Sequence, residues 1–330
     1  MRKGGLYRGM PVRTPHTPIR AHIPNSSPEV PFRASFRGLF AVVAPVVLAM
    51  VATPFCLAGD TTERTLDSTP AEPGSESYFG DWFNRVDRTQ AEQPHWMTPL
   101  VTVTPRLEEE FRYDQFWETL PHGSGTLESF GGGKGLELIP AEKVELIVGI
   151  PPYMQRGDNE RAYGFGDWQF ALVKYRILSA NEQHGNYILS AFFAATAPTG
   201  SHPFTSHYFG LTPTLAAGKG WGDFDIQTTF GATFPVADLQ KAGVPLAYNV
   251  TLQYHLLSVL WPEFEANYTY YANGPDAWKS RLFLTPGIVL GRFHVWDRLK
   301  FTVGAGYQFA VTEDHPQYRD NWILSVRMPF

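Results

Sequence analysis

The side chains with the greatest chemical potential in this sequence are charged residues at every second position of extended segments. Within residues 101–113, apolar side chains occupy one parity and mostly charged side chains the other. A period of two is that of a β-strand with two different faces. If such strands close into a barrel, their charged faces share one interior. We therefore expect this interior to be lined by Arg106, Glu108, Glu110, Arg112, Glu137, Glu145, Asp223, Asp225, His255, Glu263 and Glu265.

This charged interior has two interpretations. An acid-biased, water-filled pore would disfavour anions. An interlocked network of ion pairs would instead fill a narrow lumen and stiffen it. Ionised groups need water or partners in both cases, so the sequence leaves both interpretations open.

Catalysis in this interior is an alternative with little support. Glu263 and Glu265 could act as general acid and base only if their surroundings kept one protonated and the other ionised. A hydrolase would need His255 to activate Ser258, with Asn249 as the orienting residue. A serine three residues from its base along a strand lies on the opposite face. We expect no catalytic residue.

Two other patterns point away from cofactors. The histidines show no spacing of the His-Glu-x-x-His type that holds zinc. The glycine-rich run 131–135 lacks the hydroxyl residue after Lys134 that a phosphate loop requires, and it precedes a strand instead of a helix. We expect this run to be a flexible loop, and we expect neither a metal nor a cofactor.

The period of two recurs along the chain and predicts twelve strands. Small and polar residues face one side and large apolar residues the other, which is the inverse of a soluble barrel. The predicted fold class is all-β, a 12-stranded antiparallel transmembrane β-barrel of the outer-membrane type. Lys174 and Arg176 have the parity of lipid-facing residues, near a strand end from which long side chains reach the interface. The predicted strands are 101–113, 134–139, 143–151, 166–178, 186–197, 208–217, 222–234, 246–257, 262–271, 281–292, 299–311 and 321–330.

The predicted connections support the same fold, because outer-membrane barrels have short turns on the periplasmic side and longer loops outside. With a periplasmic N-terminus, the outer connections are 114–133, 152–165, 198–207, 235–245, 272–280 and 312–320. The periplasmic connections are 140–142, 179–185, 218–221, 258–261 and 293–298. Every outer connection is longer than every periplasmic one, which a soluble sandwich does not require.

The last ten residues have the period of a closing strand. Their apolar side chains share one parity, opposite Ser325, Arg327 and Pro329. In a barrel this strand pairs with the first, so that no edge remains. It resembles the C-terminal strand by which the barrel-assembly machinery recognises outer-membrane proteins. We predict an insertion signal formed by Trp322, Leu324, Val326, Met328 and Phe330.

The chain before the barrel domain, 97–330, divides into two segments. Residues 1–58 join a basic region to a charge-free run that contains Cys56, which predicts a long leader with a signal peptide cleaved after Ala58. An uncleaved helical anchor is the alternative. Residues 59–96 predict a periplasmic arm with a short amphipathic helix at 78–86. That helix could plug or gate the lumen, lie on a membrane surface, or belong to a loosely ordered arm.

Composition limits the partners. Charged residues make up 18% of the chain, against about 25% in an average soluble domain. Without residues 1–58, 20 basic residues face 31 acidic ones, a net charge near −11. A nucleic-acid partner would need the opposite sign. We expect outer-membrane lipids and a small-molecule solute as partners, and no nucleic acid.

Several short motifs between residue 94 and the C-terminus resemble those of one family. They are Pro94-His95-Trp96, Leu107-Glu108, Val144-Glu145-Leu146, Gly149-Ile150-Pro151-Pro152-Tyr153, Gly164-Phe165-Gly166-Asp167, Pro198-Thr199-Gly200, Gly222-Asp223-Phe224-Asp225, Pro262-Glu263-Phe264-Glu265 and the terminal Phe330. The family is that of the outer-membrane transporters named after the meta-cleavage pathway of phenol degradation, distantly akin to the long-chain fatty-acid and toluene channels. The resemblance implies passage of hydrophobic or aromatic compounds, and it carries over no individual binding residue.

The sequence thus predicts a channel in the bacterial cell outer membrane for passive passage of small solutes. Two alternatives remain open. One is a barrel-embedded hydrolase, and the other is a structural barrel with an occluded lumen.

Overall fold

The computed structural model describes residues 78–132, 134–157, 161–312 and 317–330. The contacts divide the chain into Met1–Thr65 and Leu66–Phe330, and every described residue belongs to the second unit. The predicted leader, 1–58, and the first part of the predicted arm, 59–77, lie outside the described residues. None of the helices in the described ranges is long and apolar enough to cross a membrane.

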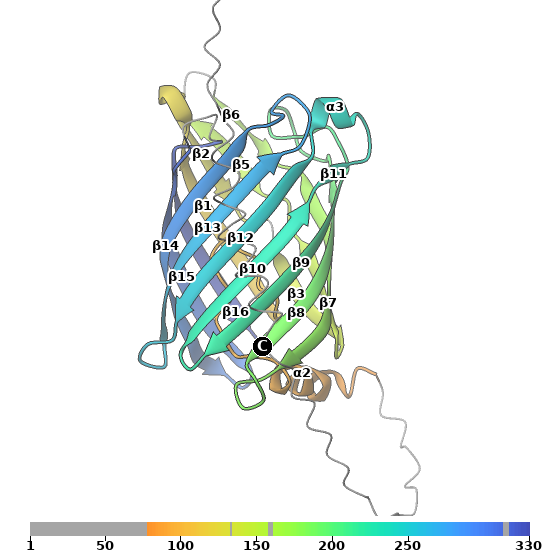
Figure 1. Ribbon diagram of the computed structural model, residues 1–330, viewed down its shortest axis with the longest axis vertical. Coiled ribbons are helices and arrows are strands. Elements are labelled where there is room, and N and C mark those ends of the chain that lie inside the picture. Colours follow the sequence, from red (N-terminus) through yellow and green to blue (C-terminus); the bar gives the residue numbers. More distant parts are fainter. Residues whose placement is uncertain (1–77, 133, 158–160, 313–316) are drawn as a thin grey trace, which may run out of the picture. The chain divides into compact units, whose positions relative to one another are not determined.

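Twelve antiparallel strands close into a barrel, as the alternating sequence predicts (Figure 1). Each strand pairs with its neighbours in the ring, and the last strand, β16, returns to the first, β1. The ring therefore has no free edge at which another chain could add. Three short strands, β2, β5 and β6, extend one side of the wall, and β11 pairs with β9.

The strands of the ring are β1 (Glu110–Thr119), β3 (Gly135–Ala141), β4 (Val144–Gly149), β7 (Trp168–Ala180), β8 (Tyr187–Ala197), β9 (Gly210–Trp221), β10 (Phe224–Ala232), β12 (Pro245–Tyr254), β13 (Leu260–Tyr271), β14 (Ser280–Trp296), β15 (Leu299–Ala310) and β16 (Asp320–Pro329). The other elements are α2 (Trp82–Ala91), η1 (Pro121–Gly123), β2 (Thr126–Phe130), β5 (Tyr153–Gly157), β6 (Ala162–Phe165), β11 (Phe234–Pro235) and α3 (Leu239–Ala242).

Three neighbouring strands of the wall are interrupted. β2 is separated from β3 at 131–134, β4 from β5 at 150–152, and β6 from β7 at 166–167. At the first break, Gly131 and Gly132 have φ angles of 74° and 97°, which favour glycine. The glycine-rich run that the sequence predicts as a flexible loop lies at this interruption.

Inward and outward positions alternate along the strands and separate polar from apolar side chains. In β16, Ser325 and Arg327 are buried, whereas Trp322 on the opposite face is 59% exposed. β16 pairs with β1 along its whole length, so the predicted closure of the barrel by the last strand is confirmed. Other strands carry the same apolar outer face, and examples of its exposed side chains are Tyr175, Phe193, Leu215, Phe230 and Phe264.

The two ends of the barrel differ. One end, called here the short-turn end, has turns such as 222–223 and 297–298, together with α2 and the C-terminal residue (Figure 1). The other, the long-loop end, has loops such as 198–209. Between the twelve ring strands, every connection at the long-loop end is longer than every connection at the short-turn end, as predicted. The smallest difference is that between 272–279 and 181–186.

The predicted first strand, 101–113, is wrong in its position. β1 is Glu110–Thr119, and residues 101–109 form no strand. Alternation of residue types therefore does not by itself show that a backbone joins a ladder. The barrel wall therefore begins at Glu110, and a helix, α2, lies close to the position predicted for one.

A positive charge on the outer face should destabilise the barrel according to its depth in the membrane. We predict that Leu215→Arg, in the interior of β9, lowers the free energy of unfolding by about 2–4 kcal/mol, because hydrocarbon does not solvate a guanidinium group. Leu257→Arg, in a turn at the short-turn end, is the matched control with an expected cost of about 0–1 kcal/mol. Denaturant titration in lipid bilayers measures both, and equal costs would contradict the assignment of the outer face.

Candidate functional site

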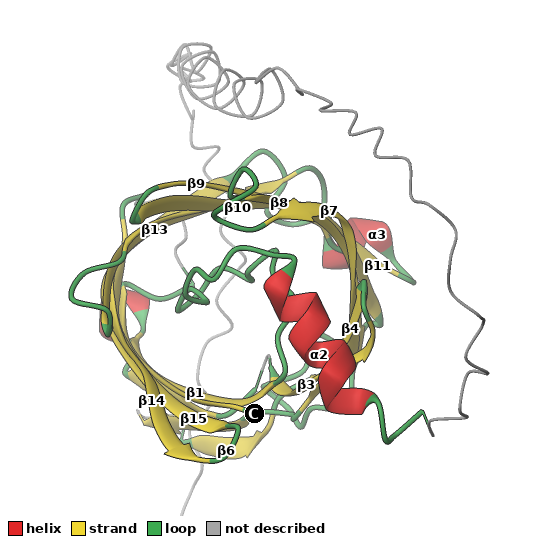
Figure 2. Ribbon diagram, turned by 90° about the horizontal axis from the view of Figure 1, so that it is seen from below, coloured by secondary structure: helices red, strands yellow, loops and turns green. Residues whose placement is uncertain are grey.

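The lumen of the barrel is occupied by the chain itself. Residues 93–109, called here the lumen segment, run from the end of α2 through the ring of strands to the start of β1 (Figure 2). Within the described residues, no backbone–backbone hydrogen bond joins residues 94–108 to the wall. Side chains of the wall bind the peptide groups of the segment instead.

Two carboxylates of β13 accept N–H groups in the middle of the lumen segment. Glu263 accepts from the backbone N–H of Leu100 at 3.0 Å. The two oxygens of Glu265 accept from Val101 and Thr102 at 2.7 Å each. These two predicted lumen residues therefore bind three consecutive N–H groups and hold the segment at its centre.

Two arginines bind the carbonyl groups of the same stretch. Arg112 of β1 donates to Pro99 O at 3.1 Å and to Leu100 O at 2.6 Å. Arg327 of β16 donates to Pro99 O at 2.8 Å and also to Thr98 O. The segment is therefore held by acids at its N–H groups and by arginines at its carbonyls.

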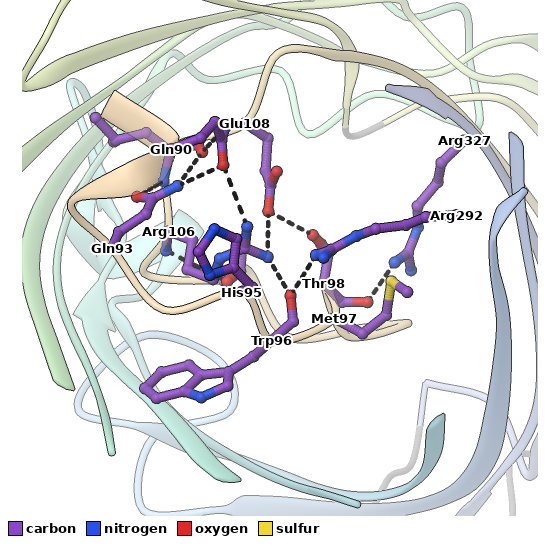
Figure 3. Close-up of polar contacts among 12 residues, drawn as sticks. Gln90, Gln93, His95, Trp96, Met97, Thr98, Arg106, Glu108, Arg292 and Arg327 are labelled. Carbon is purple, nitrogen blue, oxygen red and sulfur yellow. Dashed lines mark hydrogen bonds and ion pairs between the residues drawn. The ribbon is translucent and has the colours of Figure 1, made fainter. Parts of the chain in front are cut away.

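Near the short-turn end, the carbonyl of Trp96 accepts from two guanidinium groups (Figure 3). One belongs to Arg106, which also pairs with Glu108 at 2.8 Å. The other belongs to Arg292 of β14, at 2.7 Å, where a bulge after Gly291 shifts the strand. Two cations thus share one carbonyl, and one of them also pairs with a carboxylate.

A lysine in the wall binds the last part of the lumen segment. Lys174 of β7 is fully buried and lies 2.9 Å from Glu145 and 4.0 Å from Glu137. Its Nζ donates to Arg106 O at 3.1 Å, and Glu145 accepts from the N–H of Glu108 at 2.7 Å. The ion pair therefore binds a carbonyl and an N–H of the segment at the same time.

Lys174 and Arg176 face the lumen, so the prediction that they face lipid is wrong. Bulges in β7 at 169–171 and 176–178 shift its register against β8, and a bulge changes the parity of the residues beyond it. Arg176 is buried and pairs with Glu92 at 2.7 Å, just before the lumen segment.

Glycines of the wall leave room for large side chains of the lumen segment. A Cβ added to any of three glycines in β14 and β15 would lie 2.5–2.7 Å from the side chain of Leu100. A Cβ on Gly218 would lie 2.4 Å from the ring of Trp96. Wall and segment are thus complementary in shape as well as in charge. The seat of Leu100 is formed by Gly287, Gly304 and Gly306.

Helix α2 lies across the barrel at the short-turn end (Figure 2). Trp82 donates from Nε1 to Glu109 at 2.6 Å, and Asp87 pairs with Arg298 of the β14–β15 turn at 2.6 Å. The hydrogen bond from Arg298 lowers the pKa of Asp87 below its ordinary value. This contact therefore supports docking of α2 at neutral pH and is lost as the pH falls through the lowered pKa.

A cavity of about 370 Å³ remains at this end, bordered by α2, the lumen segment and the wall. The wall contributes Arg292, Lys300 and Arg327, and acidic side chains are contributed by Glu108 and Glu110. Charged groups at this end therefore border space that water can enter, which lowers the cost of keeping them ionised.

The predicted lumen residues fall into two groups. Asp223 is exposed in the turn between β9 and β10, so the prediction that it lines the lumen is wrong. His255 lies in the turn after β12 and stacks on Trp261, with ring centroids 4.3 Å apart. Strand parity does not extend into turns. The other predicted residues are buried, namely Arg106, Glu108, Glu110, Arg112, Glu137, Glu145, Asp225, Glu263 and Glu265.

The residues of the hydrolase alternative are not brought together. Asn249 lies within β12 and donates to Thr229 Oγ1 at 2.9 Å, whereas Ser258 is exposed in the turn that contains His255. Metal ligands do not converge either. Across the part of the chain that the structure describes, no group of three or more His, Cys, Asp or Glu residues could hold a metal ion.

Sequence reasoning missed residues that lie outside the predicted charged faces. The side-chain amide of Gln93, in the predicted arm, donates to Leu107 O at 2.7 Å and accepts from its N–H at 3.0 Å. A bulge brings Arg292 into the lumen, which parity does not predict. Gly304 and Gly306 were a usable signal, because glycine on the inner face of a strand permits the close approach of another group.

Comparisons with known proteins find similar solved structures only. No family model and no curated protein matches the chain. The chain is similar to an outer-membrane channel from Pseudomonas putida F1, with 16% identity and a TM-score of 0.44, over 66% of this chain and 92% of that one. The NanC porin is 8% identical, with a TM-score of 0.40, over 66% of this chain and 98% of that one. The transport unit of the autotransporter AIDA-I from Escherichia coli is 12% identical, with a TM-score of 0.33, over 75% of this chain and 97% of that one.

The class of protein follows from the chain's own closed ring and apolar outer face. It is a transmembrane β-barrel of the outer-membrane type. Its distinguishing feature is the lumen segment that fills the barrel.

Removal of Lys174 should lower the stability of the barrel substantially. Lys174→Met leaves Glu137 and Glu145 buried without their cation, and breaking one side of a buried pair costs about 3–5 kcal/mol of stability. Adding Glu145→Gln should restore part of this loss, because it removes one of the unpaired charges. Lys241→Met, at an exposed ion pair, is the control and should change little. Unfolding in bilayers measures all three, and a Lys174→Met barrel of wild-type stability would contradict the role given to this lysine.

Proposed function

We propose that this protein is a channel of the bacterial outer membrane for passive passage of small solutes, and that the lumen segment is its gate. The observation that carries the proposal is the way the segment is held, by wall side chains and not by a β-ladder. In this proposal the short-turn end faces the periplasm, because barrels of this type have their short turns there.

The contacts of the lumen segment are of a kind that water can replace. Most of the polar contacts are hydrogen bonds between a wall side chain and a peptide group, and both partners are satisfied by water when they separate. The closed ring of strands loses none of its ladder bonds when the segment leaves. A movable segment inside a fixed wall is what gating requires.

The character of the wall also favours a channel over a structural barrel with an occluded lumen. The wall behind the segment carries buried charged and amide side chains, among them Glu263, Glu265, Arg327 and Gln227. Ionised groups need water or partners. The peptide groups of the segment are their partners while it is in place, and water would hydrate them once it has left. Charged walls remain compatible with a water-filled state.

The resemblance noted in the sequence extends this proposal to hydrophobic or aromatic solutes. For insertion into the membrane, we propose that the barrel-assembly machinery recognises β16. Outward Trp322 and the continuous pairing of β16 with β1 fit such a signal.

Filling the seat of Leu100 should open the channel. Gly306→Val removes space that the Leu100 side chain occupies, and overpacking of this kind costs about 1–3 kcal/mol. We expect the ratio of open to closed states to rise roughly 5- to 150-fold. Single-channel recording of the full-length protein in planar bilayers measures the change.

Ala305→Val is the matched control, because Ala305 is the neighbouring residue on the exposed outer face. It should remain as closed as the wild type. Equal open probabilities in the two variants would argue against the gate. A folded barrel that stays silent in both would favour the structural alternative.

A further inference from the structure

One sector of the inner wall presents three kinds of group to the lumen segment. The carboxylates of β13 accept three consecutive N–H groups, and the arginines of β1 and β16 donate to three consecutive carbonyls. Between them in ring order, β14 and β15 supply the glycines that receive Leu100. We call this set of residues the clamp. It consists of Glu263, Glu265, Arg112, Arg327, Gly287, Gly304 and Gly306.

Each charged member of the clamp is also held by a neighbour in the wall. The supporting contacts are Arg112 with Asp114 at 2.8 Å, Arg327 with Ser325 at 3.0 Å, Glu263 with Gln253 at 2.6 Å and Glu265 with Thr251 at 3.1 Å. None of these contacts involves the lumen segment. The clamp therefore keeps its positioning contacts when the segment leaves, which is the preorganisation that a binding site needs.

The seat of Leu100 in the clamp accommodates an aliphatic side chain. Leu100 is 1% exposed and packs with Met97 of the lumen segment and with Trp261, Val289 and Ile323 of the wall. The three wall residues stay in place when the segment moves. An apolar seat the size of leucine then lies between the acids and the arginines.

We propose that the clamp binds short peptides with an aliphatic side chain, and that the lumen segment occupies this site as an internal competitor. This proposal rests on the proposed function, because a solute reaches the clamp only after the segment has moved. A peptide offers N–H donors to the carboxylates and carbonyl acceptors to the guanidinium groups. Its side chain fills the seat, as Leu100 does.

Other solutes satisfy only part of the clamp. An inorganic anion would be attracted by the arginines but repelled by Glu263 and Glu265. A cation would be attracted by the two acids but repelled by the arginines. An apolar compound without amide groups would fill the seat and leave the lumen-facing polar atoms of four side chains with neither water nor a partner, which is costly. A peptide is the class of solute that serves all three kinds of group.

The test uses the full chain with the lumen segment displaced by Leu100→Glu, which puts a carboxylate into the apolar seat beside Glu263. Ion current through this variant is recorded in a planar bilayer while Gly-Leu-Gly or Gly-Gly-Gly is added. We expect Gly-Leu-Gly to interrupt the current at a roughly ten- to hundredfold lower concentration, because only its leucine side chain is buried in the seat.

Two substitutions in the same background separate the parts of the clamp. Gly306→Val fills the seat and should abolish the difference between the two peptides. Arg327→Gln removes a charged donor to two carbonyls and should weaken the action of both peptides roughly tenfold, while ion current persists.

The outcomes distinguish this inference from the channel proposal on which it rests. Equal action of the two peptides, or no interruption by either while ion current flows, would overturn the peptide site and leave the channel standing. A folded barrel without ion current in every variant would overturn both.

Discussion

A polypeptide that enters the lumen of a closed barrel must find partners for its peptide groups, because the ring offers no free strand edge. The lumen segment meets this requirement through side chains alone. Glu263 and Glu265 take N–H groups, and Arg112 and Arg327 take carbonyls. The charge pattern of the inner wall is therefore explained by the backbone that it binds. The acids and arginines here bind peptide N–H and carbonyl groups as well as forming ion pairs with each other.

Shape and charge together select one register of the lumen segment. Glu263 and Glu265 accept three consecutive N–H groups, so a shift by one residue in one direction would bring Pro99, which has no N–H, to Glu263. The same shift would move Leu100 away from Gly304 and Gly306, the positions where its side chain has room. A segment held this way has a single well-defined position but, among the residues that the structure describes, no hydrogen bonds in the β-ladder. It can therefore leave the wall without breaking the ladder, which a strand of the wall cannot do.

The sequence predicted the class of fold because a strand's period of two depends on neighbouring residues only. The same rule misplaced the first strand, since the lumen segment alternates in sequence like a wall strand without joining the ladder. It also misplaced Lys174 and Arg176, because a bulge leaves no mark in local parity. The inward position of Glu265 was predictable, but its role was not. Its partner Val101 lies 164 residues away, and no pattern within a strand encodes that contact.

The gate can be tested most directly with a reversible disulfide between the lumen segment and the wall. Leu100→Cys and Gly304→Cys, with Cys56→Ser, place two thiols where a Cβ on Gly304 would lie 2.7 Å from the end of the Leu100 side chain, and we expect them to form a disulfide. The account predicts that the oxidised barrel is silent in a planar bilayer and that reduction in the same membrane produces current steps. The same current before and after reduction would show that ions bypass the segment, and would contradict it.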